Sequence, residues 1–290
     1  MAENRGPKFT IVQLLAVIAM VIFVGIWFAG LRRTTREPAN KIKCSSNLRQ
    51  VALAIKMYAN SERGGALPRT HYDPATAYRP VAWTNPDAAN PFADTGPQPN
   101  DVTAAVFLIL RTQEITTDVF ICPSPSVTAE RFVIAQGNTI QSYSNFRSQA
   151  ELSYSFHNPY STEAAAKAGA KWDETLPEDF AIAADINPGV PALMSVKFTD
   201  EGKLQRSVNS PNHNYDGQNV LYADAHVEWN ASVWAGSQQD HIYTFAKHDM
   251  AKTTTPSPAN PPEPAGIVGS PIGPLDTVLL PAWDQKIPLP

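Results

Sequence analysis

The longest apolar run in the chain lies near its N-terminus. From Phe9 to Leu31 the sequence reads FTIVQLLAVIAMVIFVGIWFAGL, with no charged residue and only Thr10 and Gln13 as strongly polar positions. A helix of this length rises about 34 Å, enough to cross a hydrocarbon core of about 30 Å. The pattern therefore predicts a transmembrane helix over 9–31. A buried core helix would need protein on every face, and a cleaved signal would have a shorter apolar region followed by an Ala-x-Ala-like site.

Basic side chains flank this run on both sides. Arg5 and Lys8 precede it within a short leader, residues 1–8. More of them follow it closely, namely Arg32, Arg33, Arg36, Lys41 and Lys43. Taken alone, the positive-inside rule would place the rest of the chain in the cytoplasm.

The apolar pattern then changes to a helical stripe over residues 32–63. Cys44, Leu48, Val51, Ile55 and Tyr58 recur at spacings of four, three, four and three. Such spacing predicts one apolar face on an amphipathic helix, which Pro38 can kink or restart and which the glycines at 64–65 end. The stripe requires a partner, either a sheet or another helix in a bundle.

Residues 64–252 read as one α+β domain. Seven prolines between 68 and 100 predict a long loop, and Asp101 is a candidate N-cap for the apolar helix that follows it. Later runs such as LSYSF and FAIAADI are short and β-rich, and Gln218 to Trp229 alternates as two strands around a turn. From 253 to 290 the chain is rich in proline and predicts an extended, partly ordered tail.

Composition narrows the function further. Charged residues make up only 17% of the chain and the formal net charge is −4, so there is no basic field for binding nucleic acid. The two cysteines, Cys44 and Cys122, form no CxxC pair and have no nearby histidine at zinc-ligand spacing, which argues against a structural zinc site. A disulfide between them would suit an oxidising compartment, but the sequence leaves their separation open.

Several side chains could carry chemistry, but no catalytic motif joins them. The candidates are Asp185, His213, Asp216, Asp224, His226 and Glu228. The chain has no G-x-S-x-G, H-E-x-x-H, P-loop or G-x-G-x-x-G string, and carboxylates near turns commonly accept backbone N–H bonds. We therefore predict no enzymatic activity and no cofactor, with an extracellular hydrolase as a remote alternative. A calcium site made from Asp185, Asn212, Asp216 and Asp224 is the alternative that these hard oxygen ligands favour.

The N-terminal segment resembles a known family. Gly6 in a short basic leader, followed by FTIVQLLAVIAMVI, resembles the cleavage and methylation segment of type IV prepilins and type II secretion pseudopilins. Residues 43–68, VFICPSP around Cys122 and residues 210–229 resemble, in the same order, segments of a large bacterial family of pilin-like proteins with a C-terminal His, nine residues, Asp-Gly signature. The resemblance implies that a prepilin peptidase cuts on the cytoplasmic side and that the α+β domain lies outside the cytoplasm.

The sequence departs from that family at three places. Pro7 and Lys8 separate Gly6 from Phe9, whereas the family pattern joins the glycine to the phenylalanine. Gln13 replaces the usual glutamate, which in the family pairs with the new amine of a neighbouring subunit. The signature itself is altered as well, because ten residues separate His213 from Asp224 and alanine follows where glycine is expected.

These observations predict an α+β, pilin-like fold in which a long N-terminal helix, transmembrane in its first half, packs on a small antiparallel sheet. The expected function is that of a non-catalytic, membrane-anchored structural subunit for a filament or secretion apparatus, single-pass in the cytoplasmic (inner) membrane. Its partners would be the lipid bilayer, prepilin peptidase, and copies of itself or related subunits that bind through the helix. The alternative is an unprocessed single-pass tether that presents a ligand-binding domain, which Pro7, Lys8 and Gln13 favour.

Overall fold

The computed structural model describes residues 10–124, 129–200, 202–245 and 266–283, except for the side chains of residues 27–35. The chain divides into an N-terminal unit, residues 1–40, and a C-terminal unit, residues 41–290. We describe each unit separately. The basic leader, residues 1–8 with Gly6, lies outside the described residues, as do Phe9 and residues 246–265.

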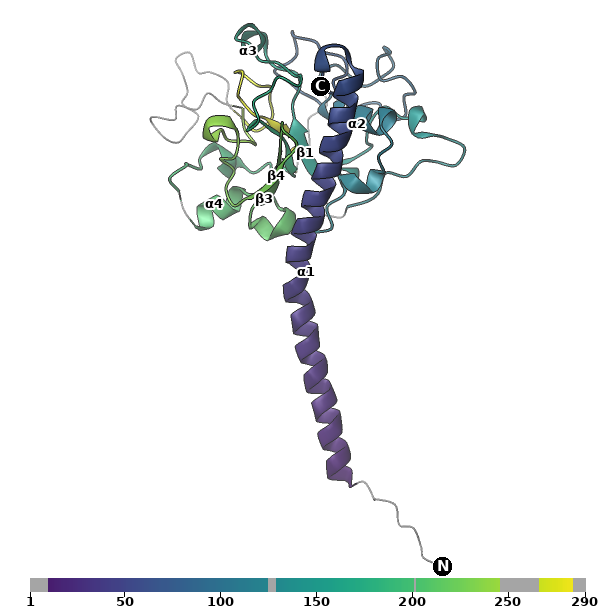
Figure 1. Cartoon of the computed structure of the whole chain (residues 1–290), viewed down its shortest axis with the longest axis vertical. Coiled ribbons are helices and arrows are strands. Elements are labelled where there is room, and N and C mark those ends of the chain that lie inside the picture. The colour runs from purple at the N-terminus through teal and green to yellow at the C-terminus, as the bar shows by residue number, and fades with distance from the viewer. Residues whose placement is uncertain (1–9, 125–128, 201, 246–265, 284–290) are drawn as a thin grey trace, which may run out of the picture. The chain divides into compact units, whose positions relative to one another are not determined.

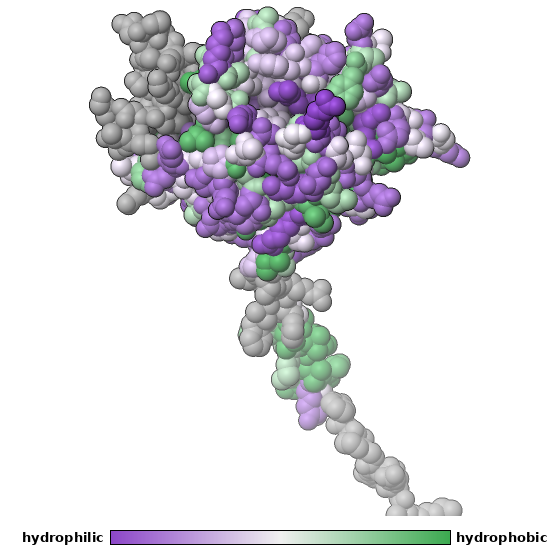
Figure 2. Space-filling model, turned by 45° about the horizontal axis from the view of Figure 1, so that its top comes forward, coloured by the Kyte–Doolittle hydropathy of each residue, from purple (hydrophilic) through white to green (hydrophobic). Residues whose placement is uncertain are grey.

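One helix, α1 (Ile11–Ser61), contributes to both units and contains Pro38 (Figure 1). In the N-terminal unit its large apolar side chains are exposed. Their exposed fractions run from 40% at Val24 to 77% at Ile11. They are Ile11, Val12, Leu14, Leu15, Val17, Ile18, Met20, Val21, Ile22, Phe23, Val24 and Ile26. In Figure 2 part of this stretch appears as a green, hydrophobic band.

The predicted transmembrane helix is not confirmed. Among the residues that the structure describes, no helix combines the length and the hydropathy that a membrane span requires. This finding contradicts three predictions. They are the fold class with a transmembrane first half, the single-pass inner-membrane location with an extracytoplasmic domain, and the assignment to the membrane and cell surface.

In the C-terminal unit, α1 buries the predicted stripe. Cys44, Leu48, Val51 and Ile55 are at most 3% exposed. They share a core with apolar side chains of the sheet, among them Phe156, Ile182 and Leu221. The partner of the stripe is therefore a sheet, and the alternative of a helical bundle is not observed.

The sheet has five antiparallel strands in the order β4-β3-β2-β1-β5. The strands are β1 (Tyr154–His157), β2 (Ala181–Asp185), β3 (Gln218–Tyr222), β4 (Val227–Asn230) and β5 (Leu279–Leu280). A bulge between Ala181 and Ala183 shifts the register of β2 against β3. A second core, which includes Val220, Val233 and Tyr243, involves the other face, so both faces of the sheet are buried. The strand β5 comes from the segment that the sequence predicted as an extended tail.

The other helices of the described chain are short. Asp101 caps α2 (Val102–Thr112) by accepting from the Ala104 N–H at 2.9 Å, as predicted. The remaining α-helices are α3 (Glu163–Lys167) and α4 (Lys203–Val208). Single 3-10 turns lie at Arg63–Gly65, Thr117–Phe120, Ile140–Ser142, Gln149–Glu151, Pro191–Met194, Asn212–Tyr215 and Ser237–Gln239.

The last residue of β1, His157, is a buried titratable group. Its Nδ1 accepts from the Val278 N–H at 3.4 Å, and its ring contacts those of Trp172 and Phe180 with centroids 5.0 and 4.8 Å apart. Burial lowers the pKa of His157 from 6.5 to about 3. The unfolded chain therefore binds a proton at His157 more readily than the folded chain does. The contribution of neutral His157 to the free energy of unfolding is present above about pH 6.5 and is lost as the pH falls toward 3.

We therefore predict that His157→Gln flattens the acid dependence of folding. Between pH 6.5 and 4 the wild-type free energy of unfolding should fall more steeply than that of the variant, by up to about 1.4 kcal/mol per pH unit. Urea titrations of the full chain at a series of pH values measure both slopes. The exposed His71 is the control, and His71→Gln should leave the slope unchanged. Equal slopes for wild type and His157→Gln would contradict the assignment.

Candidate functional site

Four potential metal ligands meet inside the C-terminal unit, and we call them the Cys-His-Asp cluster. They are Cys44, Cys122, Asp185 and His213, whose ligand atoms all lie within 4.8 Å of one another. Each side chain is at most 1% exposed. In the described part of the chain this is the one group of three or more such residues close enough to share an ion.

Separate elements supply the members of the cluster. Cys44 belongs to the buried stripe of α1, and Cys122 follows the 3-10 turn Thr117–Phe120. The structure joins these two residues, 78 positions apart, in a disulfide with a Cα–Cα distance of 5.5 Å. Asp185 is the last residue of β2. The disulfide therefore links α1 to the loop that leads toward β1, next to the end of a central strand.

His213 enters the cluster from a strained turn. Three successive residues, His213, Asn214 and Tyr215, have φ values of 58°, 59° and 61°. Asparagine and histidine tolerate this left-handed region, but tyrosine rarely adopts it, and each such residue costs on the order of 1 kcal/mol. Asn209 supports the turn by donating from Nδ2 to the Tyr215 carbonyl at 3.3 Å. Strain of this kind persists only where surrounding contacts fix the conformation, and here the conformation buries the imidazole of His213.

The Asp185 carboxylate is held by amide donors. Its Oδ2 accepts from the backbone N–H of Asn219 at 2.7 Å and from Nδ2 of the same residue at 3.0 Å. Its Oδ1 accepts from Nδ2 of Asn212 at 3.4 Å. The distance from Oδ2 to His213 Nε2 is 3.5 Å, and Nε2 lies 3.6 Å from the Cys122 sulfur. The orientation of this buried carboxylate toward the histidine is therefore fixed by its neighbours.

Two buried tyrosines adjoin Asp185. Burial, reinforced by the negative charge of Asp185, raises the pKa of both Tyr154 and Tyr243 well above the usual value. Tyr243 donates its hydroxyl to the Asp185 carbonyl at 2.7 Å, and Asn47 Nδ2 donates to the Tyr154 hydroxyl at 3.3 Å. Both phenols therefore remain protonated at neutral pH.

A charged rim lies beside the cluster. The Trp229 ring meets that of His213 edge-on, with centroids 5.6 Å apart. Lys41 Nζ lies 3.9 Å from the Trp229 ring centroid and 3.7 Å from the Asp216 carboxylate. Arg206 also forms an ion pair with Asp216. The tryptophan thus separates the buried histidine from partly exposed charges.

The residues of the family signature do not meet. His213 is fully buried in the Cys-His-Asp cluster. Asp224 lies in the exposed turn between β3 and β4, where it accepts from the His226 N–H at 2.9 Å and pairs with the His226 ring at 2.5 Å. That backbone N–H is the main cause of the lowered pKa of Asp224. In the described residues Asp224 thus stabilises its own turn, as a carboxylate in a hairpin commonly does.

The oxygen ligands suggested for calcium take separate positions. Asp185 and Asn212 are neighbours, but Asn212 presents its amide nitrogen to the carboxylate. Asp216 pairs with Lys41 and Arg206 at the rim. Gln13, the remaining predicted assembly residue, lies in the N-terminal unit, where its Oε1 accepts from the Thr10 N–H at 3.0 Å.

The spacing of these residues along the sequence does not predict the Cys-His-Asp cluster. The sequence argues against a zinc site because no histidine stands near either cysteine, yet the fold places His213 Nε2 within 3.6 Å of Cys122 Sγ. The sequence marks all four residues as candidates, but for different reasons: the cysteines as a disulfide pair, and Asp185 and His213 as polar site residues. Only the pairing of strands and helix brings them together.

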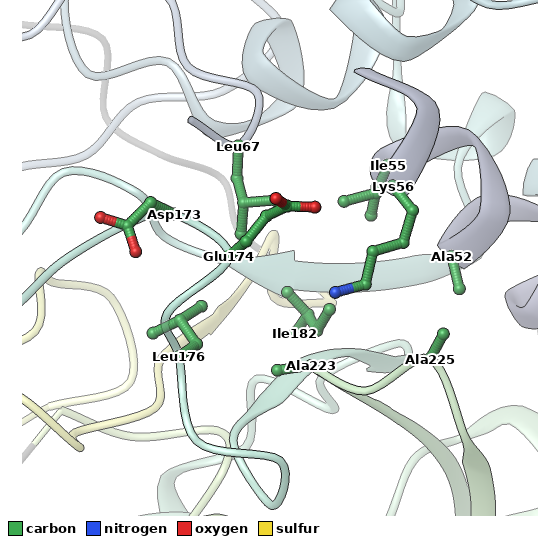
Figure 3. Close-up of a pocket in the computed structure, with 10 residues that line it drawn as sticks. All are labelled: Ala52, Ile55, Lys56, Leu67, Asp173, Glu174, Leu176, Ile182, Ala223 and Ala225. Carbon is green, nitrogen blue, oxygen red and sulfur yellow. The ribbon is translucent and has the colours of Figure 1, made fainter. Parts of the chain in front are cut away.

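The described part of the C-terminal unit has several small recesses. The one in Figure 3 is lined by Ile55, Leu67 and Ile182, with Lys56 reaching across it, and its volume of about 10 Å³ suits roughly one water molecule. Two others, beside His157, have volumes of about 20 and 40 Å³.

Comparisons of the chain with protein-family models, curated proteins and solved structures found no match. They therefore give no support to an assignment as a pilin or a type II secretion pseudopilin.

The disulfide should contribute strongly to stability. Closing a loop of 78 residues removes unfolded-state entropy equivalent to about 4.5 kcal/mol. We predict that Cys44→Ala, Cys122→Ala and the double variant each lose about this amount in denaturant titrations with a chelator present. Because either single change already breaks the same bond, the three losses should be similar. Additive losses would show that the two side chains act separately.

Proposed function

We propose that the protein is a non-catalytic structural subunit that assembles with copies of itself through the N-terminal part of α1. The observation that carries this proposal is the exposure of apolar side chains between Ile11 and Ile26. A filament-forming role of this kind is also what the resemblance to pilin-like subunits implies. The proposal does not involve a membrane.

The distribution of these side chains favours several neighbours over one. Consecutive residues such as Val21, Ile22 and Phe23 are each more than half exposed, and consecutive positions on a helix point in different directions. A helix that is apolar all round is stable only when other apolar surface covers it on more than one side. Identical helices from other copies offer such a surface.

The energy available is large enough for assembly. Burying one valine, leucine, isoleucine or phenylalanine side chain contributes about 1.5–3 kcal/mol. A few of the twelve exposed apolar side chains would offset the cost of association, which is about 4–15 kcal/mol. Exposed apolar patches of this extent mark interaction sites.

The C-terminal unit supports a structural role as well. The members of the Cys-His-Asp cluster are at most 1% exposed, so a substrate has no direct contact with them. The described recesses have volumes of about 10, 20 and 40 Å³, room for one to a few water molecules. The hydrogen bonds around Asp185 fix the ends of strands and loops. Such fixed ends are expected in a rigid structural subunit.

We predict that Val21→Asp blocks assembly. The full-length wild type should form oligomers or filaments in sedimentation velocity and negative-stain microscopy. The variant should need about tenfold or more higher concentration, because it would bury an unpaired carboxylate between helices. Val133→Asp is the matched control, since Val133 is 67% exposed and Val21 is 65% exposed.

Two results would contradict the proposal. A wild-type chain that stays monomeric across the accessible concentration range would remove its basis. Equal effects of the two aspartates would show that net charge or general solubility, and not the apolar helix, governs association.

A further inference from the structure

The Cys-His-Asp cluster has the donor set of a zinc site. Two cysteine sulfurs, one imidazole nitrogen and one carboxylate oxygen are ligand types that Zn²⁺ accepts in four-coordinate tetrahedral sites. All four side chains are buried, and their ligand atoms lie within 4.8 Å of one another. We propose that this cluster is a redox-controlled zinc site, closed as a disulfide when oxidised and able to bind one Zn²⁺ when the cysteines are reduced.

Two of the observed distances fit the edges of a tetrahedron around one ion. With Zn–N and Zn–O bonds near 2.0–2.2 Å and Zn–S bonds near 2.3 Å, neighbouring ligand atoms should lie about 3.4–3.8 Å apart. His213 Nε2 is 3.6 Å from Cys122 Sγ and 3.5 Å from Asp185 Oδ2. Two edges of the required tetrahedron are therefore already present.

The surroundings of Asp185 also suit a metal ligand. Metal-bound carboxylates are oriented by outer hydrogen bonds, and Asp185 accepts such bonds from Asn219 and Asn212. Those donors are neutral amides. A dication at the centre of the cluster would supply positive charge to a carboxylate that is fully buried, where a negative charge is costly without compensation.

Oxidation state decides whether the ion can bind. In a disulfide the two sulfurs are about 2.05 Å apart, so they are too close to occupy two corners of one tetrahedron. A dithiol reductant transfers two electrons and two protons, the S–S bond breaks, and the reductant becomes a disulfide. Zn²⁺ then displaces the two thiol protons and binds both thiolates, with the sulfurs about 3.8 Å apart.

The metal would replace the covalent link in the same place. Cys44 lies on α1, and the other three ligands come from the loop before β1, the end of β2 and the turn before β3. Zinc would therefore tie α1 to the sheet after the disulfide is reduced, and the C-terminal unit would keep its fold in both oxidising and reducing surroundings. This inference is independent of assembly through residues 11–26.

The test compares oxidised and reduced full-length protein. After reduction with a dithiol, removal of metal with a chelator and anaerobic desalting, the chain is incubated with Zn²⁺ or Co²⁺ and passed through a gel filter. We expect one equivalent of zinc by mass spectrometry in the reduced chain and less than about one tenth in the oxidised chain. The cobalt form should show thiolate-to-metal charge-transfer absorption and the intense visible bands of a tetrahedral ion.

Substitutions then identify the ligands. Asp185→Asn and His213→Gln should each weaken zinc binding about 100-fold, whereas His71→Gln should leave it unchanged. If either ligand variant fails to fold, the zinc-edge X-ray absorption of the wild type decides, with two sulfur and two nitrogen or oxygen neighbours expected. No zinc uptake by the reduced chain, equal uptake by the oxidised chain, or a metal without sulfur neighbours would overturn the proposal.

Discussion

The contact between the buried stripe of α1 and one face of the sheet is the interaction on which the C-terminal unit depends. The strands are two to five residues long, and so small a sheet gains independent stability only by packing against other elements. Leu48, Val51 and Ile55 provide that packing on one face. The position of the Cys-His-Asp cluster follows from it, because Cys44 belongs to the same stripe and reaches the end of β2 only when the helix lies on the sheet.

The polar interior is tied to this contact. Asp185 sits where β2 leaves the core, and its two carboxylate oxygens are occupied by donors from the turn before β3 and from β3 itself. The left-handed residues 213–215 are stable only because burial of His213 and the hydrogen bond from Asn209 offset their backbone cost. The packing of the apolar core thereby stabilises the strained turn at 213–215 and the buried carboxylate of Asp185.

Local patterns in the sequence predicted local structure well. The spacing of Cys44, Leu48 and Val51 indicated a buried helical face, Asp101 indicated the start of α2, and alternation indicated the hairpin of β3 and β4, all of which the structure contains. Each of these signals acts within a few residues. The transmembrane prediction used the same local reasoning on an apolar run, and the described helix does not meet the length and hydropathy of a span.

Long-range features were beyond such reasoning. The cluster joins residues up to 169 positions apart, from 44 to 213, and no periodicity specifies which distant side chains will meet. The pairing of β5 with β1 was missed for the same reason, because a two-residue strand in a proline-rich segment carries no alternating pattern. Nothing in the spacing of the two cysteines distinguished a disulfide from two separate thiols.

The place of β5 at the edge of the sheet has a consequence for how the chain is made. β1 pairs with β2 on one side and with Leu279–Leu280 on the other, while Asn187 donates to the Leu279 carbonyl at 3.0 Å and Ser155 to the Pro281 carbonyl at 2.6 Å. During synthesis, more than a hundred residues must leave the ribosome after β1 before these groups find their partners. Until then one border of β1 stays unpaired, and nascent chains translated side by side on one mRNA can pair through it.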